Sequence, residues 1–290
     1  MLKYFLAISP IPWLIRELVQ RNKVTILTYH ELSPAVADKH FKHLNSKYNI
    51  ITLKDYLSSR KTQTMNRLPP KALIITIDDG HKSNYALLEI FHKHRIKPTI
   101  FLCSGIVGSK RHFWWKNISK RNELQKLKKV SNKERLRILA QNGFEERRLY
   151  KNRQALSEDE ILNMKNLVDF QSHTIFHPIL PQCSIEQAKT EICGSKLQLE
   201  EKYRTNILAL AYPNGDYSER EIAIAIECGY ECALTLDPGF NSTITDMYKM
   251  KRFVIPDDAE ERDLILRSSG VWDYIKKKIL CSRLKMRFLK

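Results

Sequence analysis

The sequence predicts an α/β fold whose sheet closes, or nearly closes, into a barrel. Short apolar segments alternate with helix-like segments between about residue 24 and about residue 256, and this order is typical of a parallel sheet covered by helices. The apolar segments are rich in β-branched residues and lack strict polar alternation, which indicates strands that are buried on both faces. We therefore expect functional side chains at the carboxyl ends of the strands, where such barrels build their sites.

Seven segments are predicted as strands, and regions with helix signals separate them. A serine followed three residues later by Glu or Gln is a capping box, and such boxes predict helices that begin at Ser157, Ser184 and Ser218. A further helix is predicted over residues 84–94. The predicted strands are residues 24–29, 71–77, 98–103, 168–170, 207–212, 231–236 and 250–255.

Basic residues are concentrated in two regions outside the predicted barrel core. The chain has 49 Lys and Arg residues and 32 Asp and Glu residues, a net charge of +17. Residues 109–155 hold 15 basic and 4 acidic residues, and residues 271–290 hold 7 basic residues and one acidic residue. These two regions account for the whole net charge, so the rest of the chain is neutral. The first region is too long for an ordinary connection and is interpreted as a basic helical insertion.

This pattern divides the chain into three predicted parts. They are an apolar N-terminal arm over residues 1–23, a barrel over residues 24–258 that contains the insertion, and a basic amphipathic helix over residues 259–290. The arm begins MLKYFLAISPIPWLI, which looks a little like a signal segment but holds two prolines and no small-x-small cleavage site. We therefore favour an arm that packs on the body or lies on a membrane surface. No apolar run reaches the roughly 20 residues that a membrane-spanning helix needs.

The six cysteines form no CxxC pair. Several of them lie in apolar or helical stretches, where a free cysteine behaves as a small hydrophobic residue. We therefore predict unpaired thiols and a reducing compartment.

Asp78 and Asp79 follow the second predicted strand, in the sequence TIDDG. Two adjacent carboxylates at a strand end cannot both face the same way along an extended chain. One of them can bind a cation while the other acts as a base. Asp-Asp-Gly is also a common turn, and taken alone the pattern favours the turn.

His173 and His177 follow the fourth predicted strand, in the sequence SHTIFHP. Two imidazoles at this spacing can converge on one cation, and imidazole suits Zn, Fe, Co or Ni. Pro178 disfavours a helical conformation at His177, so we expect a strand end that runs into a loop. Histidines buried in a core are commoner than ligands, and only a nearby carboxylate would complete a three-residue cation site with open positions for water.

A third polar cluster, AYPNGD at residues 211–216, follows the fifth predicted strand. A tight loop of this kind can direct backbone N–H groups at a developing oxyanion. The alternative is an ordinary turn from a strand into a helix, and taken alone the cluster favours that turn.

Together, the three clusters resemble the motifs of the polysaccharide deacetylase family, also called the NodB-homology domain, a family of metal-dependent carbohydrate esterases. TIDDG, SHTxxHP and AYPNG stand in the family's order, each at a predicted strand end, and the resemblance covers about residues 24–256 outside the insertion. It implies a distorted barrel with fewer than eight strands. It also implies a hydrolase of non-peptide carbon–nitrogen bonds that removes acyl groups, usually acetyl, from N-acylated sugars.

The resemblance further implies roles for individual residues. Asp79, His173 and His177 would bind a divalent cation, Zn in the first place, with Co, Ni or Fe as alternatives. Asp78 would be the general base, and the backbone N–H near Asn214 would help to hold the oxyanion. These roles agree with the chemistry, because an amide is a poor electrophile that needs a polarised carbonyl and an activated water together.

The sequence departs from the family pattern at two places. Family members often carry an arginine that holds the catalytic aspartate at the start of the third motif, where this chain has Ala211. They also often supply a general acid from a histidine on the last strand, which here reads RFVIP over residues 252–256. His30, Asp257 and Asp258 are candidate acids, and metal-bound water could also serve. Metal binding is therefore the firmer expectation, and efficient turnover the less firm one.

Aromatic residues near these motifs and in the basic regions suggest binding partners. Trp114 and Trp115 could stack on a sugar, bind lipid headgroups or pack in a core, and we predict contact with the sugar because aromatic platforms near a barrel mouth suit a sugar ring. Tyr212 is a further residue predicted to contact the sugar. Residues 271–290 interleave aromatic and aliphatic with basic residues, which fits an interfacial helix on an anionic membrane and equally a helix packed on the barrel. The chain shows no nucleic-acid-binding module, so nucleic acid is an unlikely partner despite the charge.

The function predicted from the sequence is removal of an N-acyl group from an amino sugar in cell-envelope polysaccharide or glycolipid biosynthesis. The predicted location is the cytoplasm, peripheral to the inner face of the membrane. The alternative is a catalytically impaired relative that binds glycan or membrane without turnover.

Overall fold

A computed structural model describes residues 2–278 of the chain. Within these residues the main path of the sheet runs through seven strands in the order β7-β6-β5-β4-β3-β1-β8, and the short β2 pairs with β3 off this path. Every ladder between these strands is parallel. The strands are β1 (Val24–Tyr29), β2 (Asn49–Ile50), β3 (Ala72–Ile77), β4 (Thr99–Leu102), β5 (Asp169–Ser172), β6 (Ala209–Ala211), β7 (Cys232–Leu234) and β8 (Phe253–Val254).

The segment that leads into β8 brings the two ends of this curled sheet together. Phe253 of β8 pairs with Leu27 of β1. Just before it, Met250 forms a parallel bridge with Leu234 of β7, and its N–H donates to the Ala233 carbonyl at 3.0 Å. The predicted distorted barrel with fewer than eight strands on its path is therefore confirmed.

Side chains from both faces of the strands are buried, as the sequence predicts. Alternate residues of β1 and β3, such as Ile26 and Ile74, belong to a cluster that includes Ala209, Ala211 and Cys232. The small residues of β6 and β7 leave room for the larger side chains opposite. Intervening residues, such as Leu27 and Ile75, pack in the main core against the surrounding helices.

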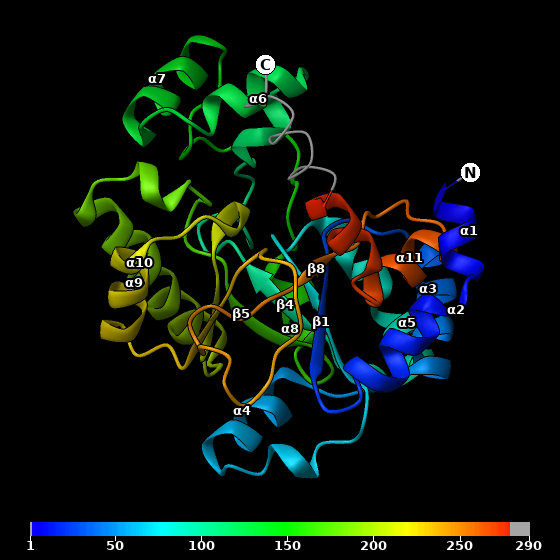
Figure 1. Ribbon diagram of the computed structural model, residues 1–290. Helices are drawn as coiled ribbons and strands as arrows, with labels where there is room; N and C mark the ends of the chain where they lie inside the picture. The colour runs from blue at the N-terminus through cyan, green and yellow to red at the C-terminus, as the bar shows by residue number, and fades with distance from the viewer. Residues whose placement is uncertain (1, 279–290) are drawn as a thin grey trace, which may run out of the picture.

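Helices cover the outside of the sheet and one of its ends (Figure 1). Side chains of α4 pack with the first residues of β1 and β3, so this helix covers the amino ends of the strands. The predicted capping boxes at Ser157, Ser184 and Ser218 are all present. The predicted helix over residues 84–94 begins instead as a 3-10 helix at Lys82.

The helices between the strands are α3 (Pro34–Lys47), α4 (Leu53–Lys61), α5 (Leu88–His94), α8 (Glu158–Met164), α9 (Ile185–Tyr203) and α10 (Glu219–Glu227), and α11 (Glu261–Ser268) follows the last strand.

The basic insertion forms helices α6 (Arg121–Leu127) and α7 (Asn132–Gln141), preceded by the 3-10 helix η4 (Trp114–Asn117). It has a small core of its own, in which Trp114 packs with Leu127 and Leu139. In Figure 1 the insertion lies at the opposite end of the sheet from α4. Contacts of its side chains with the loops that follow β5 and β6 place it over the carboxyl ends of the strands.

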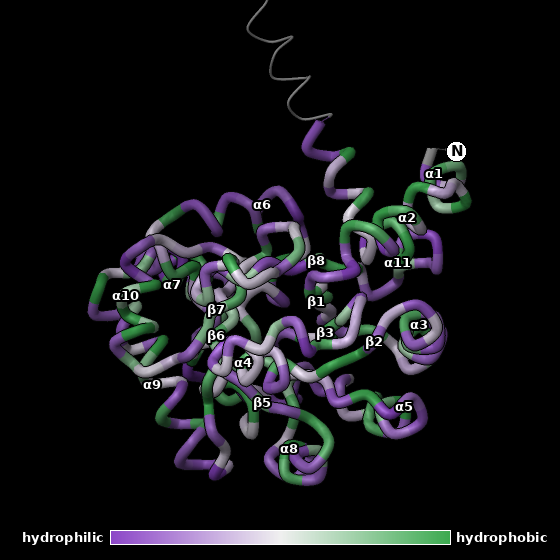
Figure 2. The backbone as a smooth tube through the Cα atoms, turned by 60° about the horizontal axis from the view of Figure 1, so that its bottom comes forward, coloured by the Kyte–Doolittle hydropathy of each residue, from purple (hydrophilic) through white to green (hydrophobic). Residues whose placement is uncertain are grey.

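The N-terminal residues form α1 (Leu2–Ile8), α2 (Pro10–Leu14) and the π-helix η1 (Ile15–Val19). Figures 1 and 2 show α1 beside α11, and the Lys3 ammonium lies 2.6 Å from Asp263 of that helix. Residues 271–278 are helical as well, whereas residues 279–290 of the predicted C-terminal helix lie outside the described residues. The helices that the structure describes include none with the length and apolar character needed to span a bilayer. The predicted domain limits remain a prediction.

Cys193 of α9 and Cys228, directly after α10, form a disulfide with their Cα atoms 5.3 Å apart. The prediction that the thiols are unpaired is wrong for these two residues. They are 35 residues apart and meet only because α9 and α10 pack together. No short sequence pattern therefore predicts this disulfide. Cys103, Cys183 and Cys232 are buried free thiols, and Cys281 lies outside the described residues.

Candidate metal centre and catalytic residues

The carboxylates of Asp78 and Asp79 diverge because the chain turns sharply at the end of β3. The Asp78 N–H still continues the sheet by donating to the Tyr29 carbonyl at 2.9 Å. Asp79 and Gly80 then both have positive φ, 75° and 74°. A glycine is required at Gly80, because a Cβ there would lie 2.6 Å from the Leu102 side chain. A non-glycine residue such as Asp79 in this region is strained, and such strain is concentrated at functional sites.

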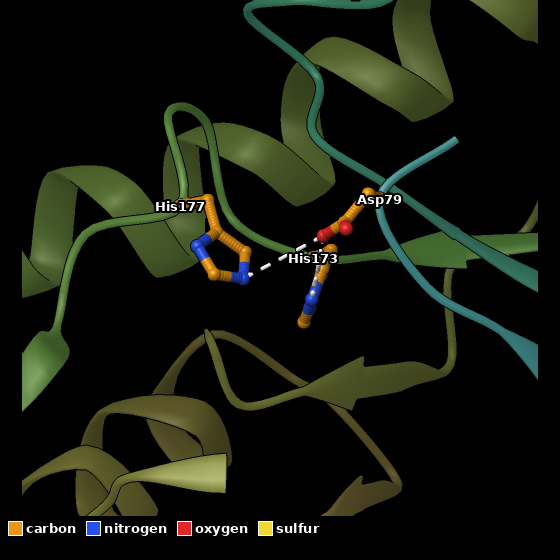
Figure 3. Close-up of side chains that lie close together, drawn as sticks. All are labelled: Asp79, His173 and His177. Carbon is orange, nitrogen blue, oxygen red and sulfur yellow. Dashed lines mark ion pairs between the residues drawn. The ribbon is translucent and has the colours of Figure 1, made fainter. Parts of the chain in front are cut away.

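Asp79, His173 and His177 come together at this strand end (Figure 3). One ligand atom from each of the three buried residues lies within 4.8 Å of the other two. The Asp79 Oδ1 atom is 3.4 Å from Nε2 of His173 and 3.6 Å from Nε2 of His177. The sequence predicted this convergence, and the geometry shows it.

The protonation and hydrogen bonding of these groups fit a cation. Nδ1 of His173 must be the protonated nitrogen, because it lies 2.7 Å from the Ala211 carbonyl, which can only accept. Its Nε2 is therefore the nitrogen that faces Asp79 and can coordinate a cation, an arrangement common among metal-bound histidines. Asp79 Oδ1 is buried without a hydrogen-bond partner among the described residues, so one acceptor remains available between the two imidazoles.

Charges in the cluster set the protonation states. Burial opposes ionisation of Asp79, but the imidazoles of His173 and His81 beside it outweigh burial and hold its pKa well below the usual range. Burial lowers the pKa of His177 to about 3, and the charge of His173 acts in the same direction. Burial also disfavours charge on His173, yet the carboxylates of Asp78 and Asp79 raise its pKa. A bound cation would displace that proton, since metal ligands must be deprotonated.

The loop that carries the two histidines is held by α9. One carboxylate oxygen of Glu191 accepts the N–H groups of Ile175 and Phe176, both at 2.8 Å. The Ser195 hydroxyl donates to the Thr174 carbonyl at 3.0 Å. Burial raises the pKa of Glu191 to about 7, although its backbone donors favour the ionised form.

Arg252 is the main residue of the site that the sequence analysis missed. Its guanidinium is fully buried and binds both oxygens of Asp78, from Nη1 to Oδ1 at 2.7 Å and from Nη2 to Oδ2 at 2.9 Å. It therefore supplies the contact that the family's arginine makes from the position where this chain has Ala211. The available signal was an arginine inside a predicted buried strand, because a charge there needs a partner.

The same pair explains the ionisation of Asp78. Burial raises its pKa, but the charges of Arg252 and His173 and the hydrogen bonds from Arg252 lower it further than burial raises it. The carboxylate is thus held ionised and able to accept a proton.

His81 was also missed, although it directly follows the first motif. Its Nε2 donates to Asp79 Oδ2 at 3.0 Å, and its ring centroid lies 4.5 Å from that of Phe113 in the insertion. Glu31 approaches the same imidazole at 3.7 Å and pairs with Lys116 of the insertion at 2.7 Å. The carboxylate of Asp79 is therefore oriented from the side opposite to the two histidines.

The third motif forms the 3-10 turn η6 (Pro213–Gly215), in which Asn214 has a φ of 58°. The Asn214 side chain donates to Asp216 and accepts from the Lys128 ammonium, which comes from the insertion. The turn is adjacent to the metal centre, because His173 binds the carbonyl of Ala211. The predicted role of the N–H near Asn214 remains a prediction.

Two residues predicted to contact sugar are buried instead. Tyr212 is fully buried and its hydroxyl donates to the Tyr248 carbonyl at 3.2 Å. Trp114 is 3% exposed, and its Nε1 donates to the His177 carbonyl at 2.9 Å. Neither ring offers a face to a ligand, so both predictions are corrected to packing roles. Trp115 is half-buried with its ring centroid 4.3 Å from that of His177, and for it the predicted sugar contact stays a prediction.

The candidate acids occupy different surroundings. Asp257 Oδ1 accepts the backbone N–H of His30 at 2.9 Å, so it caps the end of β1. His30 is half-buried, directly after that strand. Asp258 is exposed and lines a separate cavity with His43 and Glu261. Of the three candidates, His30 is the one whose charge helps to lower the pKa of Asp78.

The sequence matches a known protein family. The model of the polysaccharide deacetylase family matches residues 65–233, a segment that contains all three motifs. The chain belongs to the polysaccharide deacetylase family. It is therefore a hydrolase of the class that acts on N-acetyl groups of polysaccharides, as its motifs predicted.

Individual relatives agree with this membership. YxkH of Bacillus subtilis, whose name places it among the polysaccharide deacetylases, is 24% identical over 241 residues, which cover 79% of this chain and 70% of that protein. The deacetylase PplD of Streptococcus pyogenes has a similar structure, with a TM-score of 0.63, 20% identity and coverage of 85% of this chain and 98% of PplD. IcaB of Ammonifex degensii gives a TM-score of 0.61 at 17% identity, over 86% of this chain and 97% of IcaB. At these identities the two structures establish the shared fold.

Proposed function

We propose that this deacetylase-family chain removes an N-acyl group, acetyl in the first place, from an amino sugar of a cell-envelope polysaccharide or glycolipid. The observation that carries the proposal is the convergence of Asp79, His173 and His177 beside the ionised carboxylate of Asp78. Amide hydrolysis needs a Lewis acid and a base within reach of one water, and these four residues offer positions for both. The match to the polysaccharide deacetylase family supports the same chemistry.

The chain's own residues divide the work. Asp79, His173 and His177 would hold a divalent cation, which when bound would supply Lewis acidity to polarise the amide carbonyl; Zn is proposed, with Co, Ni or Fe as alternatives. Asp78 takes a proton from the attacking water. Arg252 keeps both oxygens of Asp78 in place, which limits the orientations of the base. The backbone N–H near Asn214 is proposed to hold the developing oxyanion.

Acetate release tests this function. Purified protein supplied with Zn or Co should release acetate from N-acetylated oligosaccharides, and Asp78→Asn should abolish release while the bound metal content stays near that of the wild type. Protein that binds the cation stoichiometrically and releases no acetate from a broad glycan panel would contradict the proposal.

A binding protein without turnover is the second candidate, and the absence of a histidine in residues 252–255 favours it. The Arg252–Asp78 pair favours the enzyme over this alternative, because it holds an ionised carboxylate in one orientation beside the cation site. Asp78→Asn separates the two, since a receptor would keep its glycan affinity, measured by calorimetry, and show no activity to lose.

We propose that an anionic membrane is the partner of the N-terminal arm. The arm holds many of the chain's exposed large hydrophobic residues, among them Phe5, Ile8 and Leu18 at 61%, 63% and 72% exposure, and Figure 2 shows hydrophobic residues along α1 and α2. Cationic side chains lie beside it, because the Lys3 ammonium is 4.7 Å from the ring centroid of Trp272 in the helix that carries exposed Lys276–278. Apolar residues next to lysines match the interface of an anionic bilayer.

Vesicle sedimentation tests this partner. The full chain should bind phosphatidylglycerol-containing vesicles and bind phosphatidylcholine vesicles far less. The triple variant Phe5→Ser/Ile8→Ser/Leu18→Ser should lose binding at least ~10-fold, because each buried apolar group contributes about a kcal/mol or more. The matched control is Leu149→Ser/Leu197→Ser/Ile244→Ser, whose residues are 64%, 64% and 93% exposed outside the arm. Equal loss in both triple variants would refute the arm as the binding surface.

The side of the membrane is a separate question. The cytoplasmic location predicted from unpaired thiols loses part of its basis, because disulfides such as Cys193–Cys228 are rare in cytosolic proteins. We keep peripheral membrane attachment as the proposal. The redox state of Cys193 and Cys228 in cells tests the compartment. A mass-spectrometric count of alkylated cysteines in cells should find Cys193 and Cys228 unmodified if the protein works in an oxidising compartment, and alkylated if it works in the cytoplasm.

A further inference from the structure

Amide hydrolysis in this site needs a proton donor, and the last strand of the barrel does not supply one. The departing nitrogen of an amide is a strongly basic leaving group and must be protonated as its bond to carbon breaks. The last strand segment, residues 252–255, contains no histidine. Asp257 is engaged with the backbone of His30, and Asp258 lines a different cavity.

Lys128 reaches this region from the insertion. It directly follows α6 as the C-cap residue, and its Nζ atom donates to Oδ1 of Asn214 at 2.5 Å, across 86 positions of the sequence. Asn214 is fixed from its other side, because its amide nitrogen donates to Asp216. The lysine is therefore anchored in the third motif, next to the turn whose backbone is proposed to hold the oxyanion.

The surroundings of Lys128 distinguish it from its neighbours. Its side chain is half-buried, whereas Lys126 and Lys129 are exposed. Burial lowers the pKa of Lys128, and the carboxylates of Asp216 and Asp79 offset only part of that shift. A desolvated ammonium gives up its proton more readily than an exposed one. The charge of Asp79 acts on it, which places the ammonium in the same electrostatic environment as the metal centre.

We propose that Lys128 is the proton donor to the leaving amine nitrogen, so that the insertion supplies the catalytic acid in place of a histidine on the last strand. Water gives one proton to Asp78, and its oxygen forms the new bond to the acyl carbon. The carbon–nitrogen bond breaks with its electron pair on nitrogen, and that nitrogen takes a proton from the Lys128 ammonium. The products are the carboxylic acid and the free amine, and the proton on Asp78 returns to Lys128 through solvent. This proposal rests on the proposed function.

Two substrates that differ in their leaving group test it. Lys128→Met should lower kcat for acetate release from an N-acetylated oligosaccharide by ~10²–10⁴-fold. Hydrolysis of p-nitrophenyl acetate should fall far less, within about tenfold, because p-nitrophenolate leaves without a proton. Lys128→Arg keeps the charge but holds its proton too tightly to donate it, so it should show the same selective loss.

The controls separate donation from mere support of Asn214. Lys126→Met and Lys129→Met remove the same charge from exposed positions of the insertion and should leave both activities unchanged. Metal content and the thermal unfolding midpoint should match the wild type in every variant. Equal loss on the amide and the ester would show that Lys128 only positions Asn214, and it would overturn the proposal.

His30→Asn is the competing variant. A selective loss of amide hydrolysis in His30→Asn, with Lys128→Met retaining the wild-type rate, would assign the acid to His30 and overturn the proposal for Lys128. Wild-type protein that binds metal and releases no acetate would instead overturn the proposed function and this proposal with it. The two failures are therefore distinguishable.

Discussion

The barrel and the basic insertion contribute to the site in different ways. The barrel provides buried groups whose partners come from distant strands, such as Asp78 with Arg252 and His173 with the Ala211 carbonyl. The insertion has its own small core and reaches the site from above the strand ends, through Lys128. The scaffold thus positions the proposed base and cation site, while the insertion contributes Lys128, the proposed proton donor.

The largest effect is expected inside the barrel, at Arg252. Arg252→Met leaves the buried carboxylate of Asp78 without its partner, so the free energy of unfolding should fall by ~3–5 kcal/mol. Acetate release should fall at least ~10²-fold, because the base is no longer held in position. Urea unfolding and steady-state kinetics measure the two quantities.

The double variant Asp78→Asn/Arg252→Met provides the control for that measurement. It removes both charges and should unfold less easily than Arg252→Met alone, because no unpaired buried charge remains. Equal free energies of unfolding for the single and the double variant would mean that the unpaired Asp78 carboxylate does not destabilise the fold.

Substitution of two neighbouring tryptophans should separate the structural role of the insertion from its role at the site. Trp114 is buried in the insertion's core and bound to the His177 carbonyl, so Trp114→Ala should cost ~3–5 kcal/mol of stability. Trp115 is half-buried beside the His177 ring, so Trp115→Ala should raise KM for a glycan several-fold and change the unfolding free energy by less. Similar unfolding losses in the two variants would argue that both rings only pack.

Glu191 tests how the barrel supports its histidine loop. Glu191→Leu removes the acceptor for the N–H groups of Ile175 and Phe176, and the affinity for Zn should fall ~10–100-fold, as is typical for residues that orient metal ligands. Glu191→Gln keeps an acceptor oxygen and should stay near the wild type. A competition assay with a chelating dye measures both affinities.

The same residue predicts a dependence of stability on pH. The folded-state pKa of Glu191, about 7, lies above the ordinary value of 4.5. Below pH 4.5 Glu191 is protonated in both the folded and the unfolded state, so its raised pKa does not reduce the free energy of unfolding. As pH rises through the interval up to about 7, the unfolded state releases its proton first, and the wild type should lose roughly 3 kcal/mol or less. Glu191→Gln should not show this loss. The free energy of unfolding of both proteins can be measured by urea titration at pH 5 and at pH 8, and an equal change between the two pH values in both proteins would refute the assignment.

The smallest effect is expected for the ion pair at the rim of the insertion. Lys116 and Glu31 are 28% and 40% exposed and meet at 2.7 Å. Exposed pairs of this kind contribute ~0–1 kcal/mol, so Lys116→Met should change the unfolding free energy by no more than that. A larger change would show that the approach of Glu31 to His81 depends on the insertion.

The sequence predicted those parts of the molecule that local patterns encode. The strand segments, three capping boxes and three polar clusters at strand ends are each contained in a short stretch of chain. Asp79, His173 and His177 were predicted together because each belongs to a motif whose order resembles that of the family. The distorted barrel followed from the same resemblance, and the structure confirms it.

What the sequence did not predict depends on contacts between distant segments. Arg252 meets Asp78 across 174 positions, and Cys193 meets Cys228 only because two helices pack. Trp114 and Tyr212 were expected to face sugar, since an aromatic residue near a motif carries no sign of which way its ring points. The left-handed backbone at Asp79, Thr174, His177 and Asn214 is likewise imposed by tertiary contacts, because none of these is a glycine.

The strand that completes the sheet also delivers the guanidinium that holds the catalytic carboxylate. A nascent chain that has not yet docked residues 250–255 would carry an acid at position 78 with no counter-charge in a partly formed, apolar interior. The site would thus become able to catalyse hydrolysis in the same folding step in which the final tertiary contacts form. A partly assembled molecule could be compact, bear both histidines and still be unable to deprotonate water.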